Sequence, residues 1–378
     1  MREREHLAEI LAGSGPWSYA YIDGAGDSPQ VVEQAHERSV RDRFAEIGAS
    51  EADVEALAEA LTDRPSIPSP SARYLLMRDG EVVLDEDFAG ARLGPERFGH
   101  GPVPGILPLL RHSDESVRFV VVETGREGAE VRLETAAKHS ERAPIDVAGR
   151  DDSLPKVQAG GWSHARYQRH SEDVWMHNQN EVADVVDRLV REHCPKFVVV
   201  AGDVRARQLL ADALDPASSA LVVDVDTHTR ADGADGTALE EAIRSSLDRF
   251  ATEAIHDILD RAAADNGSRG AEGVDAVTHA LQQAQVEALV LDARLVDSDS
   301  TLIALDAEPW VAAAGDATGE ANALAEIPVA EALARAAVLT SASVLVEEDD
   351  PGAPDAPREE RLVREPRALL RWPEDPPS

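Results

Sequence analysis

The first third of the chain carries apolar residues with helical spacing. Residues 1–15 show this pattern once, and residues 30–62 show it twice, on either side of Gly48. Ser50 follows this glycine, and serine is favoured at helix starts because its side-chain oxygen accepts a hydrogen bond from a free backbone N–H. The pattern therefore predicts three helices, the third with Ser50 as its N-cap.

Two short apolar runs, at residues 74–77 and 82–84, replace the helical pattern in residues 73–87. The pair Asp79-Gly80 stands in the middle of this stretch, and such a pair favours the tight turn of a β-hairpin. Residues 94–112 contain so many Gly and Pro that we expect no regular element there. We interpret them as the end of an amino-terminal α+β domain, residues 1–112.

The middle of the chain combines a second hairpin with alternating helices and strands. Residues 117–135 predict the hairpin, with its turn near residues 125–128. A long helix is expected from Ser163, as N-cap, to about His193, because its apolar residues fall mostly on one face. The strand–helix–strand order that follows implies a mostly parallel sheet, and so an α/β domain over residues 113–264. The later elements expected are strand 196–203, helix 204–214, strand 220–226 and helix 236–264.

The last part of the chain also alternates between helical and strand patterns. Residues 265–272 interrupt the pattern in the manner of a linker, and the remainder predicts a third, smaller α/β domain over residues 265–378. The acidic, proline-containing residues 347–361 are expected to form a solvated loop. The elements expected are helix 273–285, strand 286–292, helix 329–337, strand 342–348 and strand 367–372.

The composition describes an acidic protein with few lysines. Its 378 residues include 72 Asp and Glu against 37 Lys and Arg, which gives a formal net charge of -35. This composition is typical of a GC-rich genome or of a high-salt cytoplasm. Because such a charge repels phosphates, the chain is not a general nucleic-acid binder, and any nucleic-acid contact needs a local basic patch. No apolar run suits a membrane span or signal peptide, so we expect a cytoplasmic protein with no membrane partner.

Several patterns that resemble metal or nucleotide sites do not match the corresponding motifs. The single cysteine, Cys194, excludes a multi-thiolate zinc site, and we expect it at a buried helix end. Gly202 follows an apolar strand, but the other glycines and the lysine of a phosphate loop are missing, and Asp203 would repel a phosphate. Residues 224–235 match a calcium loop only in part, and the three histidines within residues 164–177 are not spaced for one metal. We therefore expect no metal and no cofactor.

Residues 156–170 are basic and free of carboxylates in this acidic chain. Such a window is not unique, since residues 97–113 form one nearly as long, and a flexible loop before an N-capped helix is the alternative interpretation. The sequence of residues 156–170 is KVQAGGWSHARYQRH, and no acidic residue occurs between Asp152 and Glu172. The two adjacent glycines allow the backbone to approach a partner closely, and the arginines supply local positive charge. We call these residues the GGW segment. Its candidate binding residues are Lys156, Gln158, Gly160, Gly161, Trp162, Ser163, Arg166, Gln168 and Arg169.

The order of these features resembles the archaeo-eukaryotic peptide-chain release factor family, which includes Pelota. In that family a strand and a short glycine hairpin open the central domain, a basic GGQ loop starts a long helix, and an apolar strand ends in Ala-Gly. The resemblance implies a three-domain release-factor-like architecture, with a central RNase H-like α/β domain and a carboxy-terminal L30e-like α/β sandwich. The counterparts here are residues 117–135, 160–186 and 197–203, together with ALQQAQVEALVLD at 280–292 as a carboxy-terminal signature.

Within this family the chain resembles the bacterial branch that contains the ribosome-hibernation factor Balon and its actinobacterial relatives, where GGW replaces GGQ. In release factors the glutamine positions the water that cleaves peptidyl-tRNA in the peptidyl-transferase centre; Trp162 stands at that place here. An indole is far bulkier and presents its donor elsewhere, so the resemblance implies docking without hydrolysis. Arg166 and Arg169 would then meet rRNA phosphates, and Trp162 would stack on a base.

The resemblance has further implications for the two ends of the chain. Residues 1–112 match the family much less clearly and contain no counterpart of the N-I-K-S motif that takes part in stop-codon recognition. The chain is therefore not expected to decode stop codons. The carboxy-terminal domain is implied to contact a translational GTPase.

Three classes of function remain open at this point. The first is a non-catalytic ribosome-binding hibernation factor that occupies the A site, with the GGW segment at the peptidyl-transferase centre. The second is an enzyme, a peptidyl-tRNA hydrolase that rescues stalled ribosomes with Gln158 or Gln168 in place of the missing glutamine. The third is an α/β protein that has kept the fold but binds something else.

Overall fold

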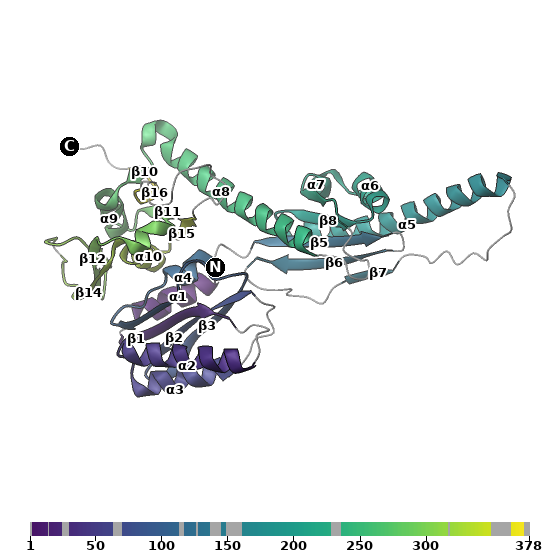
Figure 1. Ribbon diagram of the computed structural model, residues 1–378. Coiled ribbons are helices and arrows are strands. Elements are labelled where there is room, and N and C mark those ends of the chain that lie inside the picture. Colours follow the sequence, from purple (N-terminus) through teal and green to yellow (C-terminus); the bar gives the residue numbers. More distant parts are fainter. Residues whose placement is uncertain are drawn as a thin grey trace, which may run out of the picture. The chain divides into compact units, whose positions relative to one another are not determined.

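The chain folds into two compact units in a computed structural model (Figure 1). We call Glu115–Ala251 the middle unit, and Met1–Asp114 together with Thr252–Ser378 the terminal unit. The residues that the structure describes are 2–13, 15–24, 30–62, 70–112, 117–125, 128–136, 145–148, 161–227, 236–316, 318–348 and 364–373; within these, the side chains of residues 2–4, 30–34, 89, 146, 148, 161–173, 265 and 266 are outside the description.

A five-stranded sheet forms the centre of the middle unit. The order of its strands is β7-β6-β5-β8-β9; β5, β8 and β9 run parallel, and β6 and β7 are antiparallel to their neighbours. The predicted hairpin, the parallel strands and the α/β class are thereby confirmed. The strands are β5 (Arg118–Gly125), β6 (Gly128–Thr135), β7 (Ile145–Ala148), β8 (Val198–Gly202) and β9 (Val222–Val225).

Helices cover both faces of this sheet, and the alternation along β5 decides which residues meet them. Val120 and Val122 pack in the core on the side of α5 (Gly161–His193) and α6 (Val204–Ala213). Phe119 and Val121 point to the opposite face, where the first part of α8 (Thr237–Gly267) contributes Leu239. A short helix α7 (Pro216–Ser219) lies between α6 and β9.

The first part of the terminal unit contains a four-stranded antiparallel sheet with two helices on each face (Figure 1). The three predicted helices and the hairpin are present; Ser50 Oγ accepts the N–H of Asp53 at 3.1 Å, and Asp79 and Gly80 both have positive φ. The elements are α1 (Arg2–Ala12), β1 (Trp17–Asp23), α2 (Gln30–Glu46), α3 (Glu51–Thr62), β2 (Ser71–Arg78), β3 (Glu81–Ala89), β4 (Arg97–Gly101) and α4 (Leu107–His112).

The expectation that residues 94–112 form no regular element is wrong. They contain β4, which pairs with β1 in the sheet, and α4. The glycines are used for packing rather than for a linker: an added Cβ would lie 2.2 Å from the Tyr19 ring at Gly99 and 2.5 Å from its hydroxyl at Gly105. The ring of Tyr19, on strand β1, therefore explains why positions 99 and 105 are glycines.

The carboxy-terminal part of the terminal unit has two small sheets around a buried helix, α10. The expected linker at residues 265–272 is wrong, because α8 continues to Gly267 and a strand follows at once. The three-stranded sheet within residues 301–328 had no counterpart among the expected elements. The elements are β10 (Gly270–Glu272), α9 (Val274–Gln282), β11 (Val286–Asp292), η1 (Ala293–Asp297), β12 (Thr301–Leu305), β13 (Val311–Ala312), β14 (Ala323–Pro328), α10 (Val329–Leu339), β15 (Ser343–Glu347) and β16 (Arg367–Leu370).

Residues from both ends of the chain share one apolar core in the terminal unit. Leu11 and Ile106 belong to the same buried cluster as Leu333 and Leu289. Arg111 adds an ion pair to Glu348 across the two parts. The amino-terminal and carboxy-terminal parts of the terminal unit have separate sheets but form one compact unit. The division of the chain into three domains therefore stays a prediction.

A chain of polar contacts links Tyr21, His112 and the backbone of Leu93. The Tyr21 hydroxyl accepts the N–H of Leu93 at 2.7 Å and lies 2.6 Å from His112 Nε2. The His112 ring stacks on Phe88 with 4.3 Å between the ring centroids. Burial, together with the neighbouring Arg111, lowers the pKa of His112 to about 4, so this ring is neutral at physiological pH.

We predict that His112 makes the protein less stable in mild acid. The unfolded chain binds a proton at this histidine below about pH 6.5, whereas the folded chain binds it only near pH 4. Stability is therefore lost as the pH falls between these values, by at most about 3 kcal/mol. His112→Phe keeps an aromatic ring but cannot titrate; urea unfolding across this pH range should show the loss in the natural protein and not in the variant. Parallel pH profiles for the two proteins would contradict the prediction.

We also predict that Gly99→Ala destabilises the terminal unit, whereas Gly101→Ala in the same strand does not. The methyl group at position 99 meets the Tyr19 ring, and the one at position 101 has no atom within 4 Å. Overpacking of this kind costs about 1–3 kcal/mol. Thermal unfolding of the two variants provides the measurement, and equal midpoints would exclude the packing role of Gly99.

Candidate functional site

The structure places most of the GGW segment at the start of the long helix α5. Gly161 is its first residue, so the helix begins two residues before the expected N-cap Ser163. Trp162, Arg166 and the other candidates up to residue 169 lie in the first turns of this helix, in the part where only the backbone is described. Lys156, Gln158 and Gly160 lie outside the described residues.

The second half of helix α5 is anchored on the sheet. Among the residues of α5 whose side chains are described, those from Asn178 on include the buried Val182, Val186 and Leu189, which pack in the core with β5 and β6. From Gly161 to Asn178 the helix rises about 25 Å. Figure 1 shows this first half extending beyond the sheet. The backbone of residues 161–170, the described part of the GGW segment, is thereby carried away from the middle unit's core.

A buried glutamine joins the anchored half of α5 to the end of strand β5. The Gln179 side chain is fully buried; its Oε1 accepts the Thr124 hydroxyl at 2.8 Å, and its Nε2 donates to the carbonyl oxygen of Gly125 at 3.0 Å. Because α5 runs back toward the start of β8, this contact places residues 161–177 beyond the carboxyl ends of the parallel strands. The pattern of apolar residues missed Gln179, since a polar residue next to the apolar stripe gives no signal of its own.

The strand end at Gly202 is built for close packing with Thr124. Gly202 has φ +125°, and a Cβ there would lie 1.8 Å from the Thr124 carbonyl oxygen, which accepts the N–H of Asp203. The Asp203 side chain accepts the N–H groups of Arg205 and Ala206 at 2.9 and 3.2 Å, and so caps α6. The carboxylate therefore occupies the helix start at which a phosphate loop would bind its ligand.

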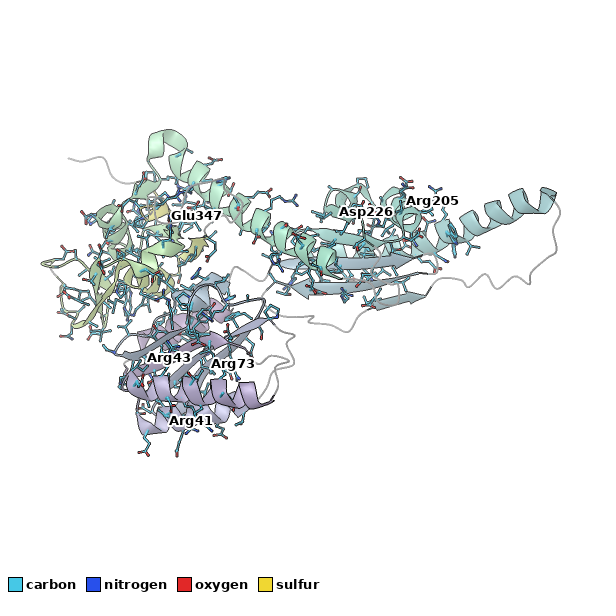
Figure 2. The ribbon with its side chains drawn as sticks, in the orientation of Figure 1. Arg41, Arg43, Arg73, Arg205, Asp226 and Glu347 are labelled. Carbon is cyan, nitrogen blue, oxygen red and sulfur yellow. The ribbon has the colours of Figure 1, made fainter. Side chains whose placement is uncertain are left out.

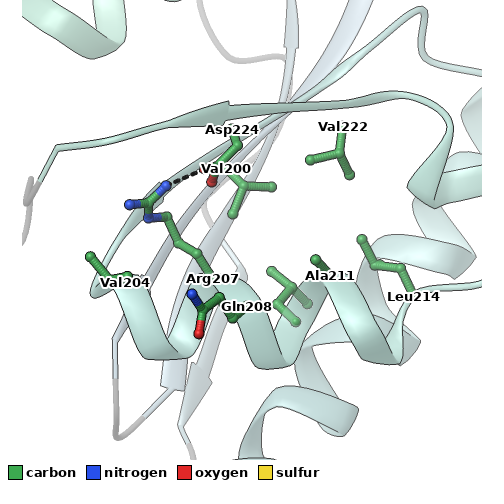
Figure 3. A pocket seen from close by; sticks show the side chains of 9 residues that line it. Val200, Val204, Arg207, Gln208, Ala211, Leu214, Val222 and Asp224 are labelled. Carbon is green, nitrogen blue, oxygen red and sulfur yellow. Dashed lines mark ion pairs between the residues drawn. The ribbon is translucent and has the colours of Figure 1, made fainter.

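A buried arginine closes a cavity of about 260 Å³ between α6 and the edge strand β9 (Figure 3). Arg207 is 6% exposed and forms ion pairs with Asp224 at 2.5 Å and Asp226 at 2.6 Å. Figure 2 labels Asp226, which follows β9, and Arg205, in the first turn of α6. Two carboxylates neutralise the guanidinium, so this cavity offers no free positive charge. It is lined by Val200, Val204, Arg207, Gln208, Leu210, Ala211, Leu214, Val222 and Asp224.

Two residues singled out from the sequence lie along α5 and just after it. Cys194 is exposed and has φ +49°, so the expectation of a buried position is wrong; it follows the last turn of the helix, where its N–H still bonds to the carbonyl of Val190. His177 lies 3.3 Å from Glu181, one turn further on. No group of three or more metal-ligating side chains occurs among the residues that the structure describes.

The middle of the chain matches a known family model. Residues 118–268 match the family model "bacterial archaeo-eukaryotic release factor family 2". This part of the chain is release-factor-like. Uncharacterized protein Rv2629 of Mycobacterium tuberculosis is 26% identical over 293 residues, 76% of this chain and 77% of that protein.

Solved structures of two translation factors align along nearly the whole chain. Pelota of Archaeoglobus fulgidus is 13% identical with a TM-score of 0.37, and the alignment covers 98% of this chain and 92% of Pelota. Dom34 of S. cerevisiae is 9% identical with a TM-score of 0.39, with 98% and 93% covered. The release-factor-like match at residues 118–268 contains all of α5, and with it the end of the GGW segment. Among the described residues no helix is long and apolar enough to cross a membrane.

We predict that Gln179→Met destabilises the middle unit by about 1–3 kcal/mol, because the buried Thr124 hydroxyl and Gly125 carbonyl lose their partner. The neighbouring Asn180 is exposed, so Asn180→Met is the matched control and should leave stability nearly unchanged. Chemical unfolding of the two variants gives the difference. Equal free energies of unfolding would show that Gln179 does not hold α5.

Proposed function

We propose that this protein is a non-catalytic ribosome-binding translation factor. It would act as a hibernation factor of the Balon-like branch, occupying the A site with the GGW segment at the peptidyl-transferase centre. The observation that carries the proposal is the release-factor-like match over residues 118–268. Within this match, helix α5 begins at Gly161, the second glycine of the GGW segment. A helix that projects about 25 Å from its anchoring glutamine suits a site deep inside a larger particle.

The distribution of charge supports a single basic contact region. In the middle unit Arg132 is bound by Glu123, Glu130 and Glu134 at 2.6 to 2.9 Å, and Arg207 by two aspartates. These arginines are compensated within the fold. In contrast, the GGW segment has no acidic residue, and the amino-terminal end of a helix adds partial positive charge. Phosphate contacts would therefore be made there, against the net charge of -35.

The chemistry of Trp162 supports binding rather than hydrolysis. The residue that follows the two glycines would face the reacting ester in the peptidyl-transferase centre, and an indole has neither the shape nor the donor position of a glutamine. Its flat ring instead suits stacking on a nucleobase. A partner GTPase would bind the carboxy-terminal part of the chain; among the structurally similar proteins, Dom34 of S. cerevisiae is a termination-like factor that interacts with Hbs1.

We predict that reversing two charges in the GGW segment abolishes ribosome binding. The double variant Arg166→Glu, Arg169→Glu should no longer sediment with 70S ribosomes, because two phosphate contacts become repulsive. Arg188 and Arg191 have the same spacing on the same helix and are exposed on its anchored half. The control double variant Arg188→Glu, Arg191→Glu has the same net charge and should still bind.

The ribosomal assignment would be refuted if the Arg166→Glu, Arg169→Glu variant sedimented with ribosomes and the control variant did not. It would also be refuted if the natural protein from starved cells did not bind ribosomes. A release assay on peptidyl-tRNA-loaded ribosomes then separates binding from catalysis. No release is expected from the natural protein. Release that is lost on Gln158→Ala or Gln168→Ala would instead establish a hydrolase with a displaced glutamine.

A further inference from the structure

Helix α10 carries two buried charged side chains that do not pair with each other. Glu331 and Arg335 are 9% and 3% exposed and lie one helical turn apart. Glu followed four residues later by Arg is the favourable order for an ion pair on a helix. Among the described residues, however, their hydrogen bonds go to backbone groups, several of them in the amino-terminal part of the chain, and the Arg335 guanidinium also lies 5.8 Å from the centre of the Trp310 ring.

Glu331 binds the start of helix α4. Its Oε2 accepts the N–H of Ile106 at 2.8 Å and that of Leu107 at 3.2 Å, and its Oε1 lies 3.3 Å from the latter nitrogen. Ile106 precedes the first residue of α4 and accepts the N–H of Leu110, which closes the first turn. Burial raises the pKa of Glu331 to about 7, against the lowering effect of these two N–H groups and of Arg97.

Arg335 binds the end of helix α1. Its Nη2 donates to the carbonyl oxygen of Leu11 at 3.2 Å, in the last turn of that helix, and its Nη1 donates to the carbonyls of Leu305 and Trp310. Burial lowers the pKa of Arg335 to about 10, and the side chain remains charged at neutral pH. No carboxylate forms an ion pair with it among the described residues.

The two contacts match the polarity of the helices that they touch. The start of a helix carries about half a positive charge and its end about half a negative charge, because the terminal N–H and C=O groups are unpaired. The carboxylate of Glu331 faces a helix start, and the guanidinium of Arg335 faces a helix end. Reversal of either helix would place like charges together in a buried site, which is strongly unfavourable.

We propose that Glu331 and Arg335 form a polarity-selective clamp, by which α10 holds the amino-terminal segment, residues 2–112, in one orientation. The shared apolar core supplies attraction without direction, and the two charged contacts supply the direction. When the segment is released, the same two side chains can pair within α10, four residues apart. The clamp therefore opens without leaving an isolated charge.

The test exchanges the two charges in the full-length protein. The double variant Glu331→Arg, Arg335→Glu keeps the composition and an intrahelical pair but presents the wrong charge to both helix ends. In hydrogen exchange, the amides of Ile106 and Leu107 should lose at least tenfold in protection, while those of β2 and β11, in the same terminal unit, keep theirs. The control variant Glu240→Arg, Arg244→Glu makes the same exchange at two exposed positions of α8 and should change nothing.

Unchanged protection at Ile106 and Leu107 in the exchanged variant would overturn the clamp. An equal loss of protection in β2 and β11 would also overturn it, since the effect would then be unfolding of the whole terminal unit. The milder variant Glu331→Gln keeps the size of the side chain and guards against misfolding. It should raise exchange several-fold at Ile106 and Leu107 alone, and an unaltered rate there would likewise refute the proposal.

Discussion

Apolar residues of helix α5 pack on the sheet, and the buried amide of Gln179 joins the helix to the end of β5. This side chain bonds to both the hydroxyl of Thr124 and the carbonyl of Gly125, at the end of β5. The same end of the sheet is held tightly because Gly202 packs against the Thr124 backbone. These contacts attach the second half of the 33-residue helix to the sheet. The backbone of residues 161–170, at the start of the helix, therefore lies at a distance from the sheet that the length of the helix sets.

Several arginines of this chain, whose net charge is -35, are neutralised by carboxylates within the fold. Arg73 is bound by Asp85, Arg132 by three glutamates and Arg207 by two aspartates, and each is largely buried. These three arginines thus form ion pairs within the folded units. Residues 156–170 contain no carboxylate, and we propose that phosphate contacts are made there, against the net charge of the chain.

The two ends of the chain meet around α10, and backbone polarity sets how they meet. Apolar packing of Leu11 and Ile106 against Leu333 would tolerate many arrangements, whereas the bonds of Glu331 and Arg335 to helix ends tolerate one. The rim pair between Arg111 and Glu348 adds little direction of its own, since exposed ion pairs are weak. In this way a terminal unit of small helices and sheets acquires a specific assembly around one buried helix.

Local sequence determined the helices of residues 30–62, the hairpins turning at Asp79-Gly80 and residues 125–128, and the α/β order of the middle unit, because spacing and turn residues act over short distances. It also identified the GGW segment, because no acidic residue occurs between Asp152 and Glu172. Only the tertiary structure decided that residues 94–112 contain β4 and α4, and that Gln179 holds α5. In each case the deciding partner, the Tyr19 ring or the end of β5, is more than fifty residues away, and no local pattern records such a contact.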